Sequence, residues 1–399
     1  MSLFSTVEQA PPDPILGVTE KYLADKRPAK VNLGVGVYQD ASGRLPLMRC
    51  VEIAEQRLAE DPKPRGYLPI DGLASYTADV RELVFGADSP LISQGRVVTV
   101  QALGGTGGLK LGADFLRQVD AAATVLISDP SWENHRALFT RAGFSVSSYR
   151  YYDPARRGID FDGMLADLTA AQPGTIVVLH ACCHNPTGYD LNREQWAQVL
   201  DVVEARNLVP FLDLAYQGFS VGLADDAWVV RTFASRLGNL FCASSFSKNF
   251  GLYGERVGAV SVLCRDADEA ARVRSQLKIV VRTNFSNPPT HGAQLVATVL
   301  ADPTLREIWT SELTGMRERI KSMRTSLASQ LAQAGVPEMG YVAEQVGMFS
   351  YSGLTRDQML RLREEFGVYG TDAGRICVAA LNENNVGYVA SSIASVVRG

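Results

Sequence analysis

From about Arg96 the sequence alternates short apolar runs with longer amphipathic stretches, and this alternation limits the possible fold more than any other feature. The apolar runs predict strands at residues 97–101, 124–128, 175–180, 209–214, 240–244 and 257–263, with helices between most of them at 132–141, 161–171, 193–206 and 227–236. Short strands alternating with helices of this length indicate a mostly parallel sheet covered by helices on both faces. We therefore predict a large α/β domain.

The segments on either side of this region have other patterns. Pro11, Pro12 and Pro14 prevent a continuous helix in residues 1–14, which we expect to form an extended arm that packs on a neighbouring subunit. Residues 31–38 alternate apolar side chains with glycine and predict a strand or an extended segment. The C-terminal part predicts a long helix at 305–331, followed by strands at 347–352 and 375–380. These patterns predict an N-terminal arm (1–14), a large domain (45–315) and a smaller α+β domain (15–44 and 316–399).

Composition excludes several classes of protein. The formal net charge is −4, so the chain lacks the basic field that nucleic-acid binding requires. Six cysteines in 399 residues, two of them adjacent, do not form a disulfide framework and indicate a reducing compartment. The N-terminus lacks the pattern of a signal peptide, and no run of 18 apolar residues predicts a membrane span. We expect a cytoplasmic enzyme that binds neither nucleic acid nor membrane.

The glycine-rich segment Gly104–Gly108 lies between a predicted strand and a predicted helix. Backbone N–H groups in such a segment can surround an anion, the helix N-terminus adds about half a positive charge, and Thr106 can add a hydroxyl group. The segment lacks the lysine of a nucleoside-triphosphate loop and the third glycine of a dinucleotide-binding fingerprint. The alternative is a tight turn that binds no ligand.

Other polar residues also follow predicted strands, where ligands of parallel sheets lie. Asp213 ends an almost entirely apolar strand, and Tyr216 comes three residues later. Burying a carboxylate is costly unless it meets a cation or a bound group. Asn185 lies in a turn with Pro186 and Gly188 that would hold it at the rim of the sheet.

The neighbouring Cys182, Cys183 and His184 raise the alternative of a metal site. Consecutive side chains point apart in a strand, and no second cluster supplies further ligands. We therefore predict no metal.

Lys248 is the only charged residue between Arg236 and Glu255, and it lies among serines and glycines after an apolar run. A lysine that is removed from water has a lowered pKa and offers its free amine, which can form a Schiff base with a carbonyl group. The alternative is a lysine in an ordinary turn rich in serine and glycine.

Trp132 and Arg375 complete the set. Trp132 follows another predicted strand. Its side chain is either an aromatic ring of the core or a flat surface for a planar ligand. Arg375 precedes an apolar strand and is either a surface arginine or a two-pronged partner for a carboxylate. One ligand uses an anion cradle, a flat aromatic, an acid, a phenol, an amide and a lysine together, and that ligand is pyridoxal phosphate.

Several segments resemble class I aminotransferases, in the branch of the aspartate and aromatic-amino-acid enzymes. The resemblance covers essentially the whole chain and is carried by Ser131-Trp132-Glu133-Asn134-His135, Cys183–Gly188, Asp213–Tyr216, Ser245–Lys248 and Arg256. It implies the fold-type I architecture of pyridoxal-phosphate enzymes, with a large domain around a mostly parallel sheet and a smaller α+β domain. It also implies a homodimer whose active sites are shared between subunits.

The same resemblance implies a role for each site residue. Lys248 would form the Schiff base and then act as general acid and base, while Asp213 would pair with the ring nitrogen of the cofactor. The other cofactor contacts would come from Gly105, Thr106, Trp132, Asn185, Tyr216, Ser245, Ser247, Arg256 and the partner subunit's Tyr67. The substrate contacts would come from Gly36, Trp132, Asn185, Arg375, which would bind the α-carboxylate, and the partner subunit's Arg282, which would bind a side-chain carboxylate.

Two positions bear on the substrate. Gly254 replaces an asparagine typical of the aspartate enzymes, and Phe285 stands where a tyrosine is common, while Arg282 is retained. We expect transfer of the amino group from aromatic amino acids, and from aspartate, to 2-oxoglutarate by a ping-pong mechanism. The alternatives are an aspartate-preferring aminotransferase, a pyridoxal-phosphate lyase or decarboxylase, a nicotinamide-dependent dehydrogenase, and a non-catalytic effector-binding domain.

Overall fold

The computed structural model describes residues 2–10, 13 and 15–399, and the chain forms two compact units. The small unit comprises Met1–Arg44, Ser322–Glu344 and Met348–Gly399, and the large unit comprises Leu45–Lys321 and Gln345–Gly347. The division at Lys321 falls inside one long helix, α13 (Pro303–Gln333), rather than in a linker. Pro11, Pro12 and Pro14 of the predicted N-terminal arm lie outside the described residues.

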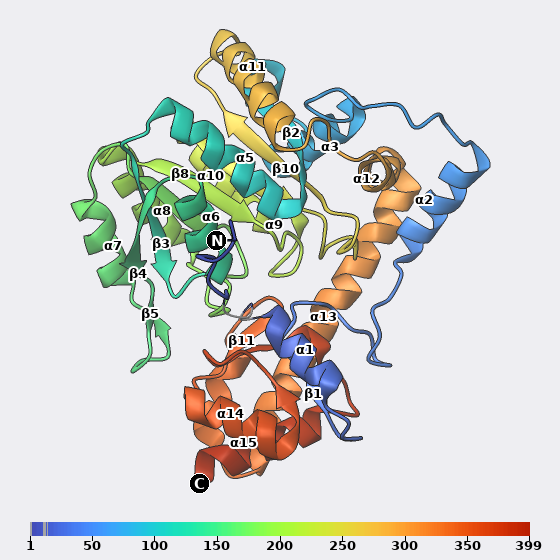
Figure 1. Ribbon diagram of the computed structural model, residues 1–399, viewed down its shortest axis with the longest axis vertical. Coiled ribbons are helices and arrows are strands. Elements are labelled where there is room, and N and C mark those ends of the chain that lie inside the picture. Colours follow the sequence, from blue (N-terminus) through green and yellow to red (C-terminus); the bar gives the residue numbers. More distant parts are fainter. Residues whose placement is uncertain (1, 11–12, 14) are drawn as a thin grey trace. The chain divides into compact units, whose positions relative to one another are not determined.

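The large unit is built on a seven-stranded sheet (Figure 1). In spatial order its strands are β2 (Val97–Leu103), β10 (Val257–Leu263), β9 (Leu240–Ser245), β8 (Val209–Leu214), β7 (Ile176–His180), β3 (Thr124–Asp129) and β4 (Ser145–Arg150). All neighbouring strands are parallel except β10, which runs antiparallel to β2 and to β9. The prediction of a mostly parallel α/β sheet is therefore confirmed.

The large unit has helices before, between and after the strands of its sheet, and those between strands agree with the predicted alternation. They are α2 (Arg49–Glu60), α3 (Ala74–Phe85), α4 (Pro90–Ser93), α5 (Gly104–Val119), α6 (Glu133–Arg141), α7 (Phe161–Ala170), α8 (Arg193–Ala205), α9 (Leu223–Asp226), α10 (Trp228–Arg236), α11 (Ala267–Asn284), α12 (His291–Ala301) and the first part of α13. A short hairpin of β5 (Tyr152–Asp153) and β6 (Gly158–Ile159) extends beyond β4.

The prediction that Gly104–Gly108 forms a loop was wrong, because α5 begins at Gly104 directly after β2. Gly104 has φ +70°, a conformation that glycine adopts without strain and that turns the chain from strand into helix. A Cβ atom on Gly108 would lie 2.6 Å from the carbonyl oxygen of Ala259, and one on Gly112 would lie 2.5 Å from the ring of Phe211. These glycines therefore let α5 pack closely on the sheet.

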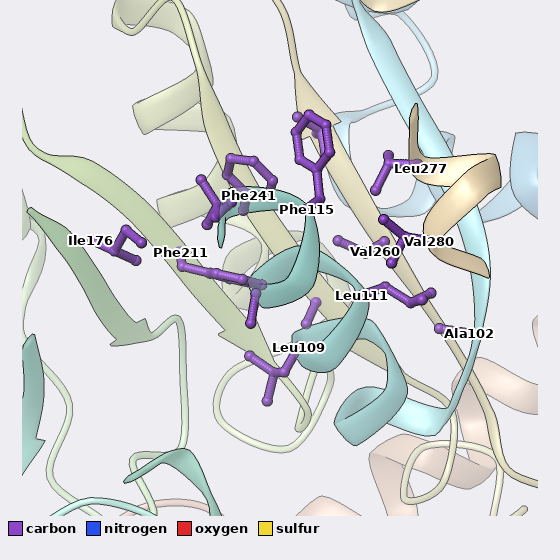
Figure 2. Close-up of a cluster of buried hydrophobic side chains, with 14 of the residues drawn as sticks. Ala102, Leu109, Leu111, Phe115, Ile176, Phe211, Phe241, Val260, Leu277 and Val280 are labelled. Atoms are coloured by element: carbon purple, nitrogen blue, oxygen red, sulfur yellow. The ribbon is translucent and has the colours of Figure 1, made fainter. Parts of the chain in front are cut away.

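One face of the sheet is covered by α5 and α11 (Figure 2). Leu111 and Phe115 of α5 lie with Phe211 and Phe241 of the sheet and Val280 of α11 in a cluster from which water is excluded. Burying each side chain of this size contributes roughly 1.5–3 kcal/mol. This core fixes the strands, and with them the residues at their carboxyl ends.

The small unit contains two small sheets. β1 (Val31–Asn32) pairs with β12 (Val368–Tyr369), and β11 (Phe349–Tyr351) pairs with β13 (Arg375–Cys377). Its helices are α1 (Leu16–Ala24), the last part of α13, α14 (Arg356–Phe366) and α15 (Val386–Arg398), with 3₁₀ turns η1 (Pro337–Ala343) and η2 (Val378–Ala380).

The strands predicted in the small unit, at residues 31–38, 347–352 and 375–380, are all shorter than expected. Of residues 31–38 only Val31 and Asn32 pair with β12. The N–H group of Leu33 donates one more hydrogen bond, to the backbone oxygen of Tyr369, and the pairing ends there. The predicted strand at residues 375–380 ends at Cys377, and the chain then turns into η2.

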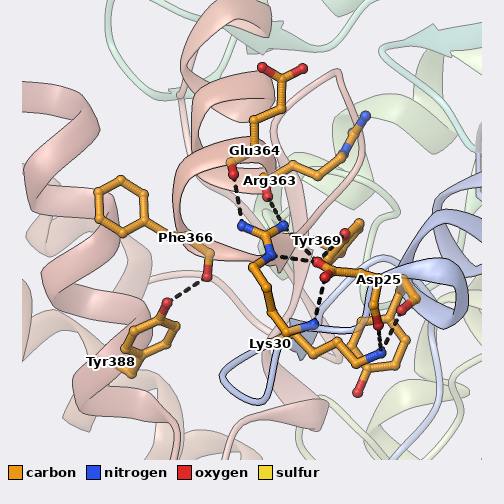
Figure 3. Close-up of polar contacts among 9 residues, drawn as sticks. Asp25, Lys30, Arg363, Glu364, Phe366, Tyr369 and Tyr388 are labelled. Carbon is orange, nitrogen blue, oxygen red and sulfur yellow. Dashed lines mark hydrogen bonds and ion pairs between the residues drawn. The ribbon is translucent and has the colours of Figure 1, made fainter.

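Polar side chains bind the first segment of the small unit to α14 and β12 (Figure 3). Arg27 donates hydrogen bonds to the backbone oxygens of Arg363 and Glu364 at the end of α14, and also to Asp25. The amine of Lys30 caps the end of α1 through the backbone oxygens of Tyr22 and Asp25. Cations at helix C-termini satisfy the last carbonyl groups and interact favourably with the helix dipole.

Among the residues that the structure describes, no helix is long and apolar enough to cross a membrane.

Candidate active site

The carboxyl ends of β7 and β8 bring His180 and Asp213 side by side, since these residues are partners in the register of the two parallel strands. A second histidine, His135 of α6, places its Nε2 atom 2.9 Å from Oδ2 of Asp213. On its other side, Nδ1 of His135 lies 2.9 Å from the hydroxyl of Ser131. The side chains of His135, His180 and Asp213 are all buried.

The environment of Asp213 keeps its carboxylate ionised. Burial raises the pKa of this group, but the hydrogen bond from His135 and the charge of Lys248 outweigh burial and hold the pKa below its ordinary value. The second oxygen, Oδ1, is buried and has no hydrogen-bond partner among the described residues. A buried carboxylate oxygen of this kind can accept a hydrogen bond from a cationic N–H group of a bound molecule.

Lys248 lies in the connection between β9 and β10, as the sequence predicted. Its Nζ atom is 5.0 Å from the centre of the Tyr216 ring, and its charge contributes to the lowered pKa of Asp213. The amine, the phenol and the carboxylate therefore face one small region at the ends of β8 and β9.

An anion cradle lies beside them, where α5 begins. The N–H group of Gly104 bonds to the backbone oxygen of Arg256, and a Cβ atom on Gly104 would lie only 2.5 Å from Nη2 of Arg256. A Cβ atom on Gly105 would lie 3.2 Å from Cβ of Ser245. Arg256 also donates to the hydroxyl of Ser247 over 3.3 Å. The first turn of α5, with Gly105 and Thr106, thus meets two serine hydroxyls and a guanidinium group, which is the donor set that a phosphate group needs.

Trp132 and Asn185 lie at the same edge of the sheet. Trp132 immediately precedes α6 and makes an edge-on contact with the ring of His135, with the ring centres 5.3 Å apart. Asn185 is buried in the turn that follows β7.

These residues fit pyridoxal phosphate. The unpartnered oxygen of Asp213 suits the protonated ring nitrogen, the cradle at α5 suits the phosphate, and Lys248 suits the aldehyde.

The potential ligand atoms of His135, His180 and Asp213 lie within 4.8 Å of one another. In the described part of the chain, this is the one group of side chains close enough together to hold a metal ion. It differs from the alternative at Cys182, Cys183 and His184, which lie in a turn rather than a strand.

The other predicted residues come from other segments of the chain. Arg282 is exposed in the last turn of α11 and donates a hydrogen bond to the hydroxyl of Ser286. The side chain of Tyr67 is 93% exposed. In the small unit, Arg375 is buried on β13, stacks on the ring of Phe349 and donates to the backbone oxygen of Gly34. A Cβ atom on Gly36 would lie 2.5 Å from the same phenylalanine ring, so that only glycine fits there.

No role was predicted for His135 or His180 from the sequence. The chain has four histidines, and His135, His180 and His184 gather at this edge of the sheet, with ring centres 4.9 Å apart for the first pair and 4.2 Å for the second. Burial lowers the pKa of His180 to about 3, so its ring is neutral. The scarcity of histidine and the spacing of His135, one helical turn after Trp132, were the available signals.

Comparisons with known proteins identify relatives over the whole chain. Residues 28–393 match the family model described as aminotransferase class I and II. The chain is 57% identical to an aspartate aminotransferase of Pseudomonas aeruginosa, with 100% of both chains covered. It is 48% identical to an aromatic-amino-acid aminotransferase of Escherichia coli strain K12, covering 99% of this chain and 100% of the other.

A solved structure is similarly close. It is an aromatic-amino-acid aminotransferase from Burkholderia pseudomallei covalently bound to pyridoxal phosphate, with 62% identity and a TM-score of 0.97, over 99% of this chain and 100% of that one.

Proposed function

Because the chain belongs to the class I and II aminotransferase family and its cofactor is pyridoxal phosphate, we propose that it carries amino groups between substrates by a ping-pong mechanism. The donors are aromatic amino acids and aspartate, and the acceptor is 2-oxoglutarate. The observation that carries the proposal is the buried, ionised Asp213, whose unpartnered oxygen lies in the same region as Lys248 and the anion cradle.

When bound, pyridoxal phosphate supplies an electron sink for charge that develops at the substrate α-carbon. Asp213 would keep the ring nitrogen protonated, and His135 would hold the carboxylate in place. The phosphate would be held by Gly105, Thr106, Ser245, Ser247 and Arg256. Their N–H groups and guanidinium group are fixed before the ligand arrives, so little reorganisation is needed.

Further residues orient the ring and move the proton. Trp132 would cover one face of the ring, and the side chains of Asn185 and Tyr216 would donate hydrogen bonds to the ring hydroxyl. The Nζ atom of Lys248 would take the proton from the α-carbon of the substrate as general base and deliver it, as general acid, to the carbon on the other side of the substrate nitrogen.

Two arginines bind the substrate carboxylates. Arg375 pairs with the α-carboxylate in two-pronged geometry, with the backbone at Gly36 beside it. Arg282 of the partner subunit pairs with the side-chain carboxylate of aspartate or 2-oxoglutarate. Gly254 leaves no side chain where the aspartate enzymes carry asparagine, and no atom lies within 4 Å of a Cβ atom built there, which supports room for an aromatic substrate.

We further propose a cytoplasmic homodimer with shared active sites. Tyr67 and Arg282 are both exposed in the single chain, as residues that serve a partner's site would be. Leu3, Phe4 and Val7 of the N-terminal arm are 84%, 71% and 71% exposed, and an apolar segment of this kind is stabilised by packing on a second subunit.

The printed names of the relatives include both aspartate and aromatic-amino-acid enzymes, so an aspartate-preferring aminotransferase is the second candidate. Steady-state kinetics with tyrosine, phenylalanine and aspartate as donors and 2-oxoglutarate as acceptor separates the two. We expect turnover with all three donors and a higher kcat/KM for the aromatic ones.

The same reactions analysed for products test the reaction type. Stoichiometric glutamate and 2-oxo acid support transamination, whereas carbon dioxide or ammonia without glutamate would identify a decarboxylase or lyase. A colourless protein that binds NADH in place of pyridoxal phosphate would overturn the proposal.

A further inference from the structure

A second carboxylate at this edge of the sheet, the half-buried Asp190, closes the turn that carries Asn185. Its Oδ2 accepts a hydrogen bond of 2.7 Å from the N–H group of Cys183, and its Oδ1 accepts one of 2.8 Å from the N–H group of His184. Cys183 has φ +53°, which lies in the left-handed region and aims these two consecutive N–H groups at one carboxylate. Asp190 thereby joins the end of the turn to its start, five residues from Asn185.

His184, the residue before Asn185, is fixed by contacts of both its ring and its backbone. The ring of His184 stacks on Tyr151 with centres 4.0 Å apart. Its Nε2 atom bonds to the hydroxyl of Ser128 and its Nδ1 atom to the hydroxyl of Thr187. The backbone of His184 is thus fixed by Asp190 while its ring is fixed by the core, and the direction of the next side chain, Asn185, follows from both.

Asp190 stabilises this turn at a cost to the fold. Burial raises the pKa of its carboxyl to about 6, the N–H groups of His184 and Cys183 oppose that rise, and the nearby carboxylate of Asp226 adds to it. Asp226 in turn accepts four backbone N–H groups from Gly218 to Gly222, in the loop after Tyr216. An apolar side chain at position 190 would leave the N–H groups of Cys183 and His184 without this acceptor, and an amide would offer one acceptor oxygen in place of two.

We propose that Asp190 is a positioning residue, which holds the Cys183–Gly188 turn so that the Asn185 side chain meets the ring hydroxyl of the bound cofactor. This inference rests on the proposed function, because it assumes that pyridoxal phosphate occupies the site in the orientation given above. Asp190 acts through the backbone of the turn and makes no contact with the cofactor itself.

The test is the pH at which the cofactor-bound protein changes colour. A hydrogen bond donated to the ring hydroxyl oxygen stabilises its ionised form, so losing that bond raises the midpoint of the colour change. In Asp190→Asn the new NH₂ group faces one of the two N–H donors and displaces the turn. We expect the midpoint to rise by about one pH unit, which corresponds to the loss of one hydrogen bond.

A double variant shows whether the effect passes through Asn185. Asn185→Ala should raise the midpoint by itself, and adding Asp190→Asn to it should raise the midpoint no further. An additive shift in the double variant, or an unchanged midpoint in a folded and yellow Asp190→Asn protein, would overturn the inference.

A matched control is Asp302→Asn. Oδ1 of Asp302 also accepts two backbone N–H groups, those of Thr304 and Leu305, at the start of α13. This variant should lose thermal stability while its midpoint stays unchanged, and an equal shift in it would overturn the inference.

Ser220→Ala is the substitute variant if Asp190→Asn does not fold, because the Ser220 hydroxyl is a hydrogen-bond partner of Asp190. It should shift the midpoint in the same direction by less, and no shift would count against Asp190. A wild-type protein that stays colourless with pyridoxal phosphate would overturn the proposed function as well, which distinguishes the two failures.

Discussion

His135 donates a hydrogen bond from Nε2 to Oδ2 of Asp213 over 2.9 Å, and both side chains are buried. The ionised carboxylate is only an acceptor, so Nε2 of the ring carries the proton of this hydrogen bond. On the other side of the ring, Nδ1 lies 2.9 Å from the hydroxyl of Ser131. This chain of three residues fixes the orientation of the carboxylate while leaving Oδ1 for a ligand.

Replacement of the histidine should weaken cofactor binding. His135→Phe keeps a planar ring of similar size but leaves Oδ2 of Asp213 buried and unpaired. Since a hydrogen bond to a charged group contributes about 1.5–3 kcal/mol, we expect the Kd for pyridoxal phosphate to rise roughly tenfold or more. Absorbance titration of the apo protein measures this. His291→Phe is the control, since His291 is exposed at the start of α12, and an equal effect there would contradict the role of His135.

Removal of the lysine should separate binding from catalysis. Lys248→Ala keeps the anion cradle and Asp213, so the protein should still bind pyridoxal phosphate, while transamination falls by a factor on the order of 10²–10⁴ or more. Borohydride treatment should no longer fix the cofactor to the protein. Lys110→Ala, which removes the partner of Asp114 on α5, should change neither readout. Near-normal turnover in Lys248→Ala would refute the role of Lys248.

Arg282, in the last turn of α11, should determine the selectivity between aspartate and aromatic donors. Arg282→Leu should reduce kcat/KM for aspartate by roughly tenfold to a hundredfold, because a charge-assisted pair contributes about 1.5–3 kcal/mol. The value for phenylalanine should change far less. Arg272→Leu on the same helix provides the comparison, since Arg272 is also exposed. Equal losses for the two donors would show that Arg282 is structural.

Asp190 should give the folded protein an unusual dependence on pH. Its pKa is raised from 3.8 to about 6 by burial, so the folded chain binds more protons than the unfolded chain between these values. The stability that the protonated group contributes is complete below pH 3.8 and is lost as pH rises through about 6. The free energy of unfolding should therefore fall over this range, relative to Asp190→Asn, by at most about 3 kcal/mol.

Urea denaturation of both proteins at pH 4.5 and pH 7, at one fixed protein concentration, measures that difference. Asp226 faces Asp190, and burial raises its pKa as well, so the two carboxyl groups act in the same direction. The pKa of Asp302 is instead lowered, chiefly by its hydrogen bond from Arg57, so Asp302→Asn should show the opposite sign. Parallel pH curves for wild type and Asp190→Asn would contradict the raised pKa of this carboxyl group.

Much of the fold and several parts of the site could be predicted from local patterns. The apolar runs that became β7, β8 and β9 are continuous and fully or almost fully buried, and such runs predict strands without knowledge of their partners. Lys248 and Asp213 stood out because a charge amid apolar or small residues needs an explanation. Gly104–Gly108 was predicted as a loop because glycine disfavours helices, but close packing of α5 on the sheet outweighs that propensity.

Local patterns are enough to identify the residues that follow the strands, because the alternation of apolar and amphipathic segments is a local property of the chain. What those residues contact depends on the folded structure. His135 and Asp213 are 78 positions apart, and the two N–H groups that Asp190 accepts converge only because Cys183 adopts a left-handed backbone conformation. Such contacts depend on the register of neighbouring strands and on the turn geometry of the loops that follow them, which are set by packing across the whole large unit and which no short segment encodes.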